Sequence, residues 1–179
     1  MNELTPTKKL AIIAMLVAQA AVLHFLESLL PNPIPIPGVK LGLANIITLI
    51  ALVVFDFKTA LNITVLRTIL GSLLSGTLFG VGFLMSFSGA ITSTCLMAIL
   101  LRAFPGFSLI GISVAGAAVH NLGQLFMAAL ILNFPGIFLY LPFMLLFSVP
   151  TGIIIGLLVK ELVQYIKLTN RFETFFQRE

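Results

Sequence analysis

The feature that constrains this chain most is its near-continuous succession of apolar segments between Leu10 and Val159. Of the 179 residues, 59% are hydrophobic and only 9% are charged. A soluble domain carries about 25% charged residues. With so few charges, the chain is predicted to be an all-α integral membrane protein, because a helix satisfies its own backbone hydrogen bonds in lipid.

Six apolar segments are predicted to form membrane helices. Their expected bounds are 9–30, 41–55, 59–78, 81–101, 107–132 and 137–159 or somewhat beyond. Most have close to the ~20 residues that a helix needs to cross the hydrocarbon core. The second is short, so we expect it to be tilted, to be re-entrant, to lie where the bilayer is thinned, or to begin inside the preceding loop.

Helix-breaking residues separate these segments. Residues 31–38 alternate proline with other residues and cannot be helical, because each proline removes a backbone donor and restricts the residue before it. Turn signals occupy 56–58, 76–82, 104–106 and 133–136. We expect a single six-helix membrane domain over 1–168, followed by a cytoplasmic C-terminal tail over 169–179.

The basic residues indicate the orientation in the membrane. Six crossings place eight of them on one side: Lys8, Lys9, Lys58, Arg102, Lys160, Lys167, Arg171 and Arg178. The opposite side has Lys40 alone. By the positive-inside rule, both termini are expected in the cytoplasm, with the chain a multi-pass membrane protein. The net charge of +4 therefore reflects topology and gives no indication of nucleic-acid binding.

One full charge, Arg67, lies deep inside the third segment. It is about nine residues from the cytoplasmic turn, or roughly 13–14 Å at the helical rise per residue, which is near the midplane. A guanidinium cannot be neutralised, and a mid-bilayer position costs about 2.5–3.5 kcal/mol. Three arrangements could offset this cost. The arginine could form a structural ion pair or carbonyl clamp between helices, it could snorkel to an interface, or it could bind an anionic ligand.

Other polar residues are expected in the outer half of the membrane. Glu27 lies near the outer end of the first segment, three residues after His24. It is either solvated at the interface, paired with Arg67 or Lys40, or available to a cationic group. Lys40 and Asn45 flank the start of the second segment, where a helix N-terminus favours an anion. These residues predict a polar cavity that opens outward beneath the loop 31–38.

The fifth segment contributes a further polar group. His120 and Gln124 are four residues apart and share a helix face, and Asn121 is adjacent. Such side chains either satisfy one another between helices or line a binding site. Small residues form separate patterns: Ala14 and Ala18 are spaced A-x-x-x-A, and the sixth segment carries G-x-x-x-G at Gly152. These faces favour close packing, either inside the bundle or on a partner membrane protein.

Several catalytic signatures are absent from the sequence. It contains no G-x-x-x-x-G-K-[ST] motif, so we do not expect the chain to hydrolyse a nucleotide itself. Asp56 is the only aspartate, so no aspartate pair can hold Mg²⁺ and a diphosphate. Two distant histidines make no zinc signature. We therefore expect a protein that is not an enzyme and that needs neither a metal nor a cofactor.

Three strings resemble a known family. Residues 37–45 read PGVKLGLAN, residues 67–76 read R-x-x-L-G-S-x-x-S-G, and residues 120–124 read HNLGQ. Together, over about Lys8 to Leu168, they resemble the family called Gx transporter or heptaprenyl diphosphate synthase component I. That family is in turn similar to the S components of energy-coupling factor (ECF) transporters.

The resemblance implies a six-helix protein that binds a micronutrient from outside the cell. It implies docking through Ala14 and Ala18 on a transmembrane scaffold that carries two ATPases, so that ATP is used by the partners and not by this chain. The synthase name implies a competing role, that of a non-catalytic membrane subunit associated with an isoprenoid or quinone enzyme. A third reading is a structural membrane protein in which Arg67 only clamps helices together.

The sequence thus predicts a substrate-binding membrane subunit that contacts lipid and binds a small molecule. We expect Arg67 and Lys40 to hold an anionic group, a carboxylate or a phosphate on an apolar body. The residues expected to orient the substrate by hydrogen bonds are Asn45, His120, Asn121 and Gln124, with Glu27 as a further member of the site.

Overall fold

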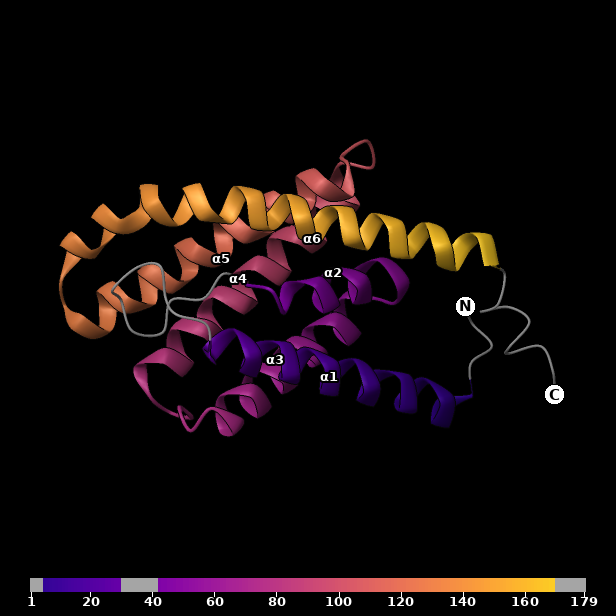
Figure 1. Ribbon diagram of the computed structural model, residues 1–179, viewed down its shortest axis with the longest axis horizontal. Helices are drawn as coiled ribbons and strands as arrows, with labels where there is room; N and C mark the ends of the chain where they lie inside the picture. The colour runs from indigo at the N-terminus through magenta and orange to yellow at the C-terminus, as the bar shows by residue number, and fades with distance from the viewer. Residues whose placement is uncertain (1–4, 30–41, 170–179) are drawn as a thin grey trace.

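The computed structural model describes residues 5–29 and 42–169, and this part of the chain is a bundle of helices without strands (Figure 1). The helices are α1 (Pro6–Leu29), α2 (Asn45–Val54), α3 (Phe57–Leu74), α4 (Val81–Ala103), α5 (Leu109–Leu132), the 3₁₀ helix η1 (Pro135–Tyr140) and α6 (Leu141–Thr169). Helix α1 packs on α3, α3 on α4, α4 on α5 and α5 on α6. The predicted all-helical fold is confirmed, and its long apolar helices are compatible with a membrane bundle.

The expected count of six spanning helices is not what the described residues show. Five helices are long and apolar enough to cross a membrane, and α2 is not among them. Helix α2 has 10 residues, or about 15 Å of length, which is half the hydrocarbon thickness. It is shorter than the expected 41–55 because residues 42–44 form a turn in which Gly42 adopts a positive φ of 85°. The short α2 packs against α3, α4 and α6, and a crossing by the second segment stays a prediction.

Helix α3 ends earlier than the expected residue 78. Gly76 adopts a φ of 68°, a left-handed conformation that glycine reaches without steric cost. Its N–H donates to the Leu73 carbonyl, and the Thr77 N–H donates to the Ser72 carbonyl at 2.9 Å. This is the Schellman arrangement, which satisfies the last carbonyls and stops the helix. Only the last four residues of the expected segment, 75–78, are lost to this turn, because the helix is otherwise continuous from Phe57 to Leu74.

The end of α6 continues past the expected boundary. It runs for 29 residues to Thr169, so the residues after Val159 continue the membrane segment as one helix. At its other end, Asn133 closes α5 in the left-handed conformation, with φ 51°. The predicted turn at 133–136 is therefore confirmed, and η1 leads from it into α6.

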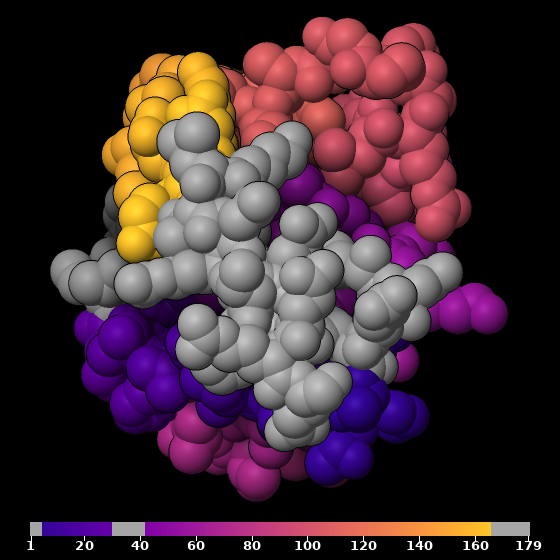
Figure 2. All heavy atoms as spheres, turned by 90° about the vertical axis from the view of Figure 1, so that its right-hand side faces the viewer, coloured from indigo at the N-terminus to yellow at the C-terminus, as the bar shows by residue number. Residues whose placement is uncertain are grey.

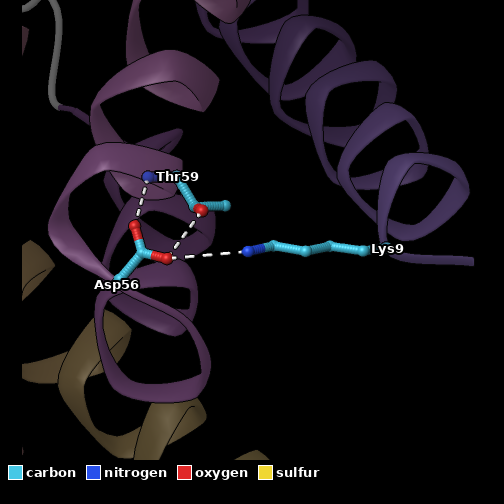
Figure 3. A network of polar contacts seen from close by, with 3 residues as sticks. All are labelled: Lys9, Asp56 and Thr59. Carbon is cyan, nitrogen blue, oxygen red and sulfur yellow. Dashed lines mark hydrogen bonds and ion pairs between the residues drawn. The ribbon is translucent and has the colours of Figure 1, made fainter. Parts of the chain in front are cut away.

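One end of the bundle is held by Asp56, which caps α3. The Thr59 N–H donates to Asp56 Oδ1 at 2.7 Å, and Lys9 Nζ lies 3.7 Å from Asp56 Oδ2 (Figure 3). The Thr59 amide holds the pKa of Asp56 below its ordinary value, and the charge of Lys9 acts in the same direction. The ion pair places the start of α1 beside the α2–α3 turn.

The described end of α6 lies at this same end of the bundle (Figure 1). Figure 2 looks onto it, with α1 in the lower half, α6 at the upper left and residues around the α4–α5 turn at the upper right. The segments that carry most of the basic residues therefore gather at one end, which agrees with the predicted grouping. The assignment of this end to the cytoplasm stays a prediction.

Two apolar clusters form the core. The larger includes Leu49, Ile63, Met97, Ile112 and Val159, all at most 1% exposed. The second contains Met85, Leu125, Ala128, Ile137 and Met144. Along α4 and α5, the buried residues between these two clusters are small or polar. The fold thus has a polar layer between two apolar ones, and this layer contains the candidate site.

Candidate functional site

The polar layer contains side chains from four helices, all buried. Asn45 comes from α2, Arg67 from α3, Ser93 from α4, and His120 with Gln124 from α5. Four of them were predicted as binding residues from the sequence, and the fold brings these four into one layer. Buried polar groups require hydrogen bonds to offset the loss of water. The hydrogen-bond partners of each side chain therefore indicate which atoms remain available to a ligand.

Arg67 is the central charge of this layer. Its side chain is 2% exposed, and its Nη2 donates to Asn45 Oδ1 at 2.8 Å. Its Nε has no hydrogen-bond partner among the described residues. The Glu27 carboxylate acts on it electrostatically. Arg67 therefore does not snorkel to an interface, and one face of its guanidinium is available for a further acceptor.

Asn45 connects three helices. Its Oδ1 accepts from Arg67, and its Nδ2 donates to Ser93 Oγ at 3.4 Å. Its backbone N–H donates to the Gly42 carbonyl at 2.9 Å, in the turn before α2. The side chain thus spans from α2 to α3 and α4 with both of its polar atoms engaged inside the protein.

Glu27 lies inside the bundle and is 4% exposed, so the solvated-interface alternative is wrong for this structure. Its Oε1 accepts from the backbone N–H of Gly42 and, at 3.2 Å, from that of Leu43. Helix α2 has no side-chain cap of its own at Ala44. A carboxylate from α1 therefore satisfies the amides that lead into α2, where negative charge is favoured.

His120 and Gln124 face α4 at a point where that helix has no side chain. A Cβ on Gly89 would lie 3.2 Å from His120 Cε1 and 2.9 Å from Gln124 Cγ. The His120 ring also lies against Gly42, whose Cβ position is 3.5 Å from His120 Cδ2. His120 is thus brought beside the turn that Glu27 holds, and the outward-opening cavity stays a prediction.

Asn121 does not join this group. Its Nδ2 donates to the Met144 carbonyl of α6 at 3.0 Å, and its Oδ1 has no hydrogen-bond partner among the described residues. The side chain therefore ties α5 to α6. Adjacent helix positions point about 100° apart, so Asn121 and His120 serve different interfaces.

The sequence reasoning missed a chain of buried threonines. Thr48 Oγ1 and Thr64 Oγ1 are 3.1 Å apart, and Thr64 Oγ1 is 3.1 Å from Thr94 Oγ1. All three are 0% exposed. The spacing in the sequence could have indicated this chain. Thr48 follows Asn45 by three residues, and Thr64 precedes Arg67 by three residues, so each threonine lies one helical turn from a predicted site residue. The threonines extend the contact between α2, α3 and α4 by one helical turn beyond the Arg67–Asn45 pair.

The two small-residue patterns differ in whether they pack inside the bundle. A Cβ on Gly152 would lie 2.7 Å from Val114 Cα, so this glycine allows α6 to pack directly on α5. Ala14 and Ala18 of α1 are instead exposed, while Val17 and Ala20 pack inward. The alanine face is therefore not used for packing within the described part of the bundle.

Two predictions concern Lys40 and the loop 31–38. Both lie outside the described residues, so their expected roles stay predictions. No group of three metal-ligating side chains occurs among residues 5–29 and 42–169. The polar layer has a different composition, with a cation, amides, hydroxyls and an imidazole that suit an anionic, oxygen-bearing guest.

Comparison with known proteins identifies the family. The family model described as heptaprenyl diphosphate synthase component I matches residues 16–162. No match to the chain was found among curated proteins or among solved structures. The matched range contains every described residue of the polar layer. The chain therefore belongs to the heptaprenyl diphosphate synthase component I family and is a membrane protein of that family.

Proposed function

We propose that this chain is the substrate-binding membrane subunit of an ECF-type importer, and that it captures a small anionic molecule from outside the cell. The observation that carries the proposal is the buried guanidinium of Arg67, whose Nε has no acceptor among the described residues. A charge in this position needs more than one neutral partner. A carboxylate or phosphate would supply the missing acceptor and a negative charge in addition to that of Glu27.

The energies support a ligand beside Arg67. A mid-membrane arginine costs about 2.5–3.5 kcal/mol on insertion scales. A hydrogen bond between a charged and a neutral group returns about 1.5–3 kcal/mol. The Asn45 contact thus offsets part of the cost, and the Glu27 carboxylate is already bonded to two backbone amides. An anion on the free Nε edge accounts for the remainder and gives the arginine a function.

Other residues have supporting roles in this proposal. His120 and Gln124 would contact the bound molecule through hydrogen bonds, and Lys40 would add a second positive charge from the outer side. Asn45 and Glu27 would shape the site from α2 and α1. Asn121, which bonds to α6, would contribute packing rather than contact. The bound molecule would meet apolar residues of the neighbouring core as well.

The chain would depend on partners for energy. Its sequence has no nucleotide-binding motif, and Ala14 with Ala18 exposes a small-residue face on α1. Such a face permits the close approach of a second membrane helix. We propose that α1 docks on a transmembrane scaffold coupled to ATPases, in a prokaryotic plasma membrane with both termini in the cytoplasm.

The description of the family supports a second candidate function. In it, the chain is a non-catalytic membrane subunit bound to an isoprenoid or quinone enzyme. Purification of the tagged chain from its native membrane separates the two. The importer proposal expects an ATPase module to co-purify, whereas the alternative expects a soluble prenyl diphosphate synthase.

Substitution of Arg67 tests the binding site directly. Arg67→Met removes the cost of the buried charge and leaves Asn45 Oδ1 unpaired, at about 1–3 kcal/mol. These effects oppose each other, so we expect the thermal stability to change little. Wild-type protein, purified gently and then denatured, should release a stoichiometric anionic molecule detectable by mass spectrometry. Arg67→Met should release none.

The matched control is Arg102→Met, at an exposed arginine in the last turn of α4. It should release the same molecule as the wild type. If Arg67 is only a structural clamp, Arg67→Met should instead lose about 3–5 kcal/mol of stability, as expected when a buried charge pair is broken. That result, together with no bound anion in the wild type, would refute the importer proposal.

A further inference from the structure

We infer that Asn45 is a positioning residue that holds Arg67 without neutralising it, so that Nε–H is the edge that binds the anion. The inference rests on the proposed function. It changes the expected role of Asn45, which the sequence reasoning assigned to direct contact with the substrate.

The first argument is that the polar atoms of Asn45 are engaged within the protein. Its Oδ1 accepts from Arg67 Nη2 at 2.8 Å, and its Nδ2 donates to Ser93 Oγ. The side chain is 4% exposed. An asparagine held in this way between α3 and α4 fixes the rotation of the guanidinium. The Nε–H is the group for which the described residues provide no acceptor.

The second argument is the charge of the residue. An aspartate at position 45 would have nearly the same shape as asparagine and would form a buried ion pair with Arg67. Because the Glu27 carboxylate already acts on Arg67, the site would then carry more negative than positive charge and would repel an anionic ligand. Asparagine accepts the same hydrogen bond but leaves the positive charge of Arg67 uncompensated at that contact. The choice of amide over carboxylate therefore favours an anionic ligand.

The third argument is the way in which Asn45 is itself held. The turn before it is fixed by Glu27, which accepts from the Gly42 and Leu43 amides. One turn later, Thr48 contacts Thr64 of α3. Asn45 is thus anchored on both sides along α2, as a residue that orients another must be. Glu27 acts through this anchor and is occupied by backbone donors.

The test uses the Nε–H signals of the full-length protein labelled with ¹⁵N-arginine, in lipid nanodiscs after exhaustive dialysis. The chain has four arginines, so the Arg67 signal can be assigned from its loss in Arg67→Lys. The probes are hexyl phosphate and hexanoate, with uncharged hexanol for comparison. In the wild type, the Arg67 Nε–H signal should shift saturably with at least one anion and stay unchanged with hexanol.

Asn45→Asp is the decisive variant. It should keep or raise the thermal stability, because an ion pair replaces a neutral contact, yet bind the anions more weakly by roughly tenfold or more. A purely structural residue would lose binding only along with stability. Asn133→Asp, in the exposed turn after α5, introduces the same change and should bind like the wild type.

Asn45→Ala provides a second readout if the aspartate variant does not fold. Without the probes, the Arg67 Nε–H should exchange with solvent faster by roughly tenfold or more, because its orientation is no longer fixed. A residue that only contacts the ligand would leave this exchange rate unchanged.

The outcomes separate the two proposals. If the wild-type Arg67 signal responds to neither anion, the anion site and the proposed function are both refuted. If the wild type binds an anion and Asn45→Asp binds it within about twofold, the inference about Asn45 is refuted and the proposed function stands. An unchanged exchange rate in Asn45→Ala would likewise refute the positioning role alone.

Discussion

The contact between α1 and α3 gives a prediction whose size follows from the structure. A Cβ added to Gly71 would lie 2.7 Å from His24 Cγ and 2.8 Å from His24 Cβ. Carbon atoms pack at about 3.5–4.0 Å, so α1 would have to move by about 1 Å. A new side-chain rotamer does not relieve the clash, because His24 Cβ is fixed to the backbone.

The expected cost of Gly71→Ala combines two opposing terms. Overpacking of a tight interface costs about 1–3 kcal/mol. Replacing a helical glycine by alanine returns up to about 1 kcal/mol through helix propensity. We therefore expect a net loss of about 1–2 kcal/mol, which lowers the unfolding midpoint by roughly 2–8 °C at 2–4 °C per kcal/mol for a chain of this size.

The assay can use the single cysteine, Cys95, which lies half-buried in α4. A thiol-reactive dye that fluoresces on coupling reports its exposure as the protein is heated in detergent. Gly106→Ala is the control, because an added Cβ there meets no atom within 4 Å. We expect the control to lie within about 0.5 kcal/mol of the wild type.

A double-mutant cycle identifies the clash partner. His24→Gly removes every His24 atom that the new methyl group would meet, so Gly71→Ala should be neutral or slightly stabilising in that background. A coupling of about 1–3 kcal/mol is expected between the two positions. If Gly71→Ala costs as much with glycine at position 24 as with histidine, the proposed α1–α3 contact is refuted.

Two other substitutions test the ends and the centre of the bundle. Asp56→Ala removes the α3 cap and should cost about 1 kcal/mol at pH 7 in the same dye assay. Because the pKa of Asp56 is lowered on folding, its stabilising effect is present above about pH 4 and is lost as the pH falls through the lowered pKa. A cost that stays constant from pH 7 to pH 3 would contradict this account. Thr64→Val removes the hydroxyl between Thr48 and Thr94 and should cost about 1–3 kcal/mol in thermal unfolding, because the buried Thr48 hydroxyl loses its partner while Thr94 still donates to the Ala90 carbonyl. An unchanged midpoint would show that the three hydroxyls do not stabilise one another.

Much of the helical fold could be predicted because it depends on local composition. The long apolar segments and their glycine, proline and asparagine turns gave the fourth and fifth helices to within two residues at each end. The second segment was expected to be short, and α2 is shorter still, because the turn at Gly42 delays its start to Asn45. Its packing against α3, α4 and α6 is set by the tertiary structure.

The site could be predicted in part for a related reason. A buried Arg67 is conspicuous in an apolar sequence, and so are Asn45 and His120. Which of these residues touch depends on helix rotation and depth, which no local pattern encodes. Asn121 differs from His120 by one position, and that step is enough to direct it to α6. The threonines escaped notice because a threonine in a membrane helix usually bonds to its own backbone.

The sequence by itself determined that this chain enters a membrane as helices, because hydrocarbon leaves an apolar segment no other way to satisfy its backbone. It also determined that one arginine must lie among them. Only the tertiary structure decided that Asn45 would meet Arg67, that Glu27 would support the start of α2, and that Ala14 and Ala18 would remain exposed. Those outcomes arise from the relative rotation and depth of whole helices, which packing of the entire bundle sets.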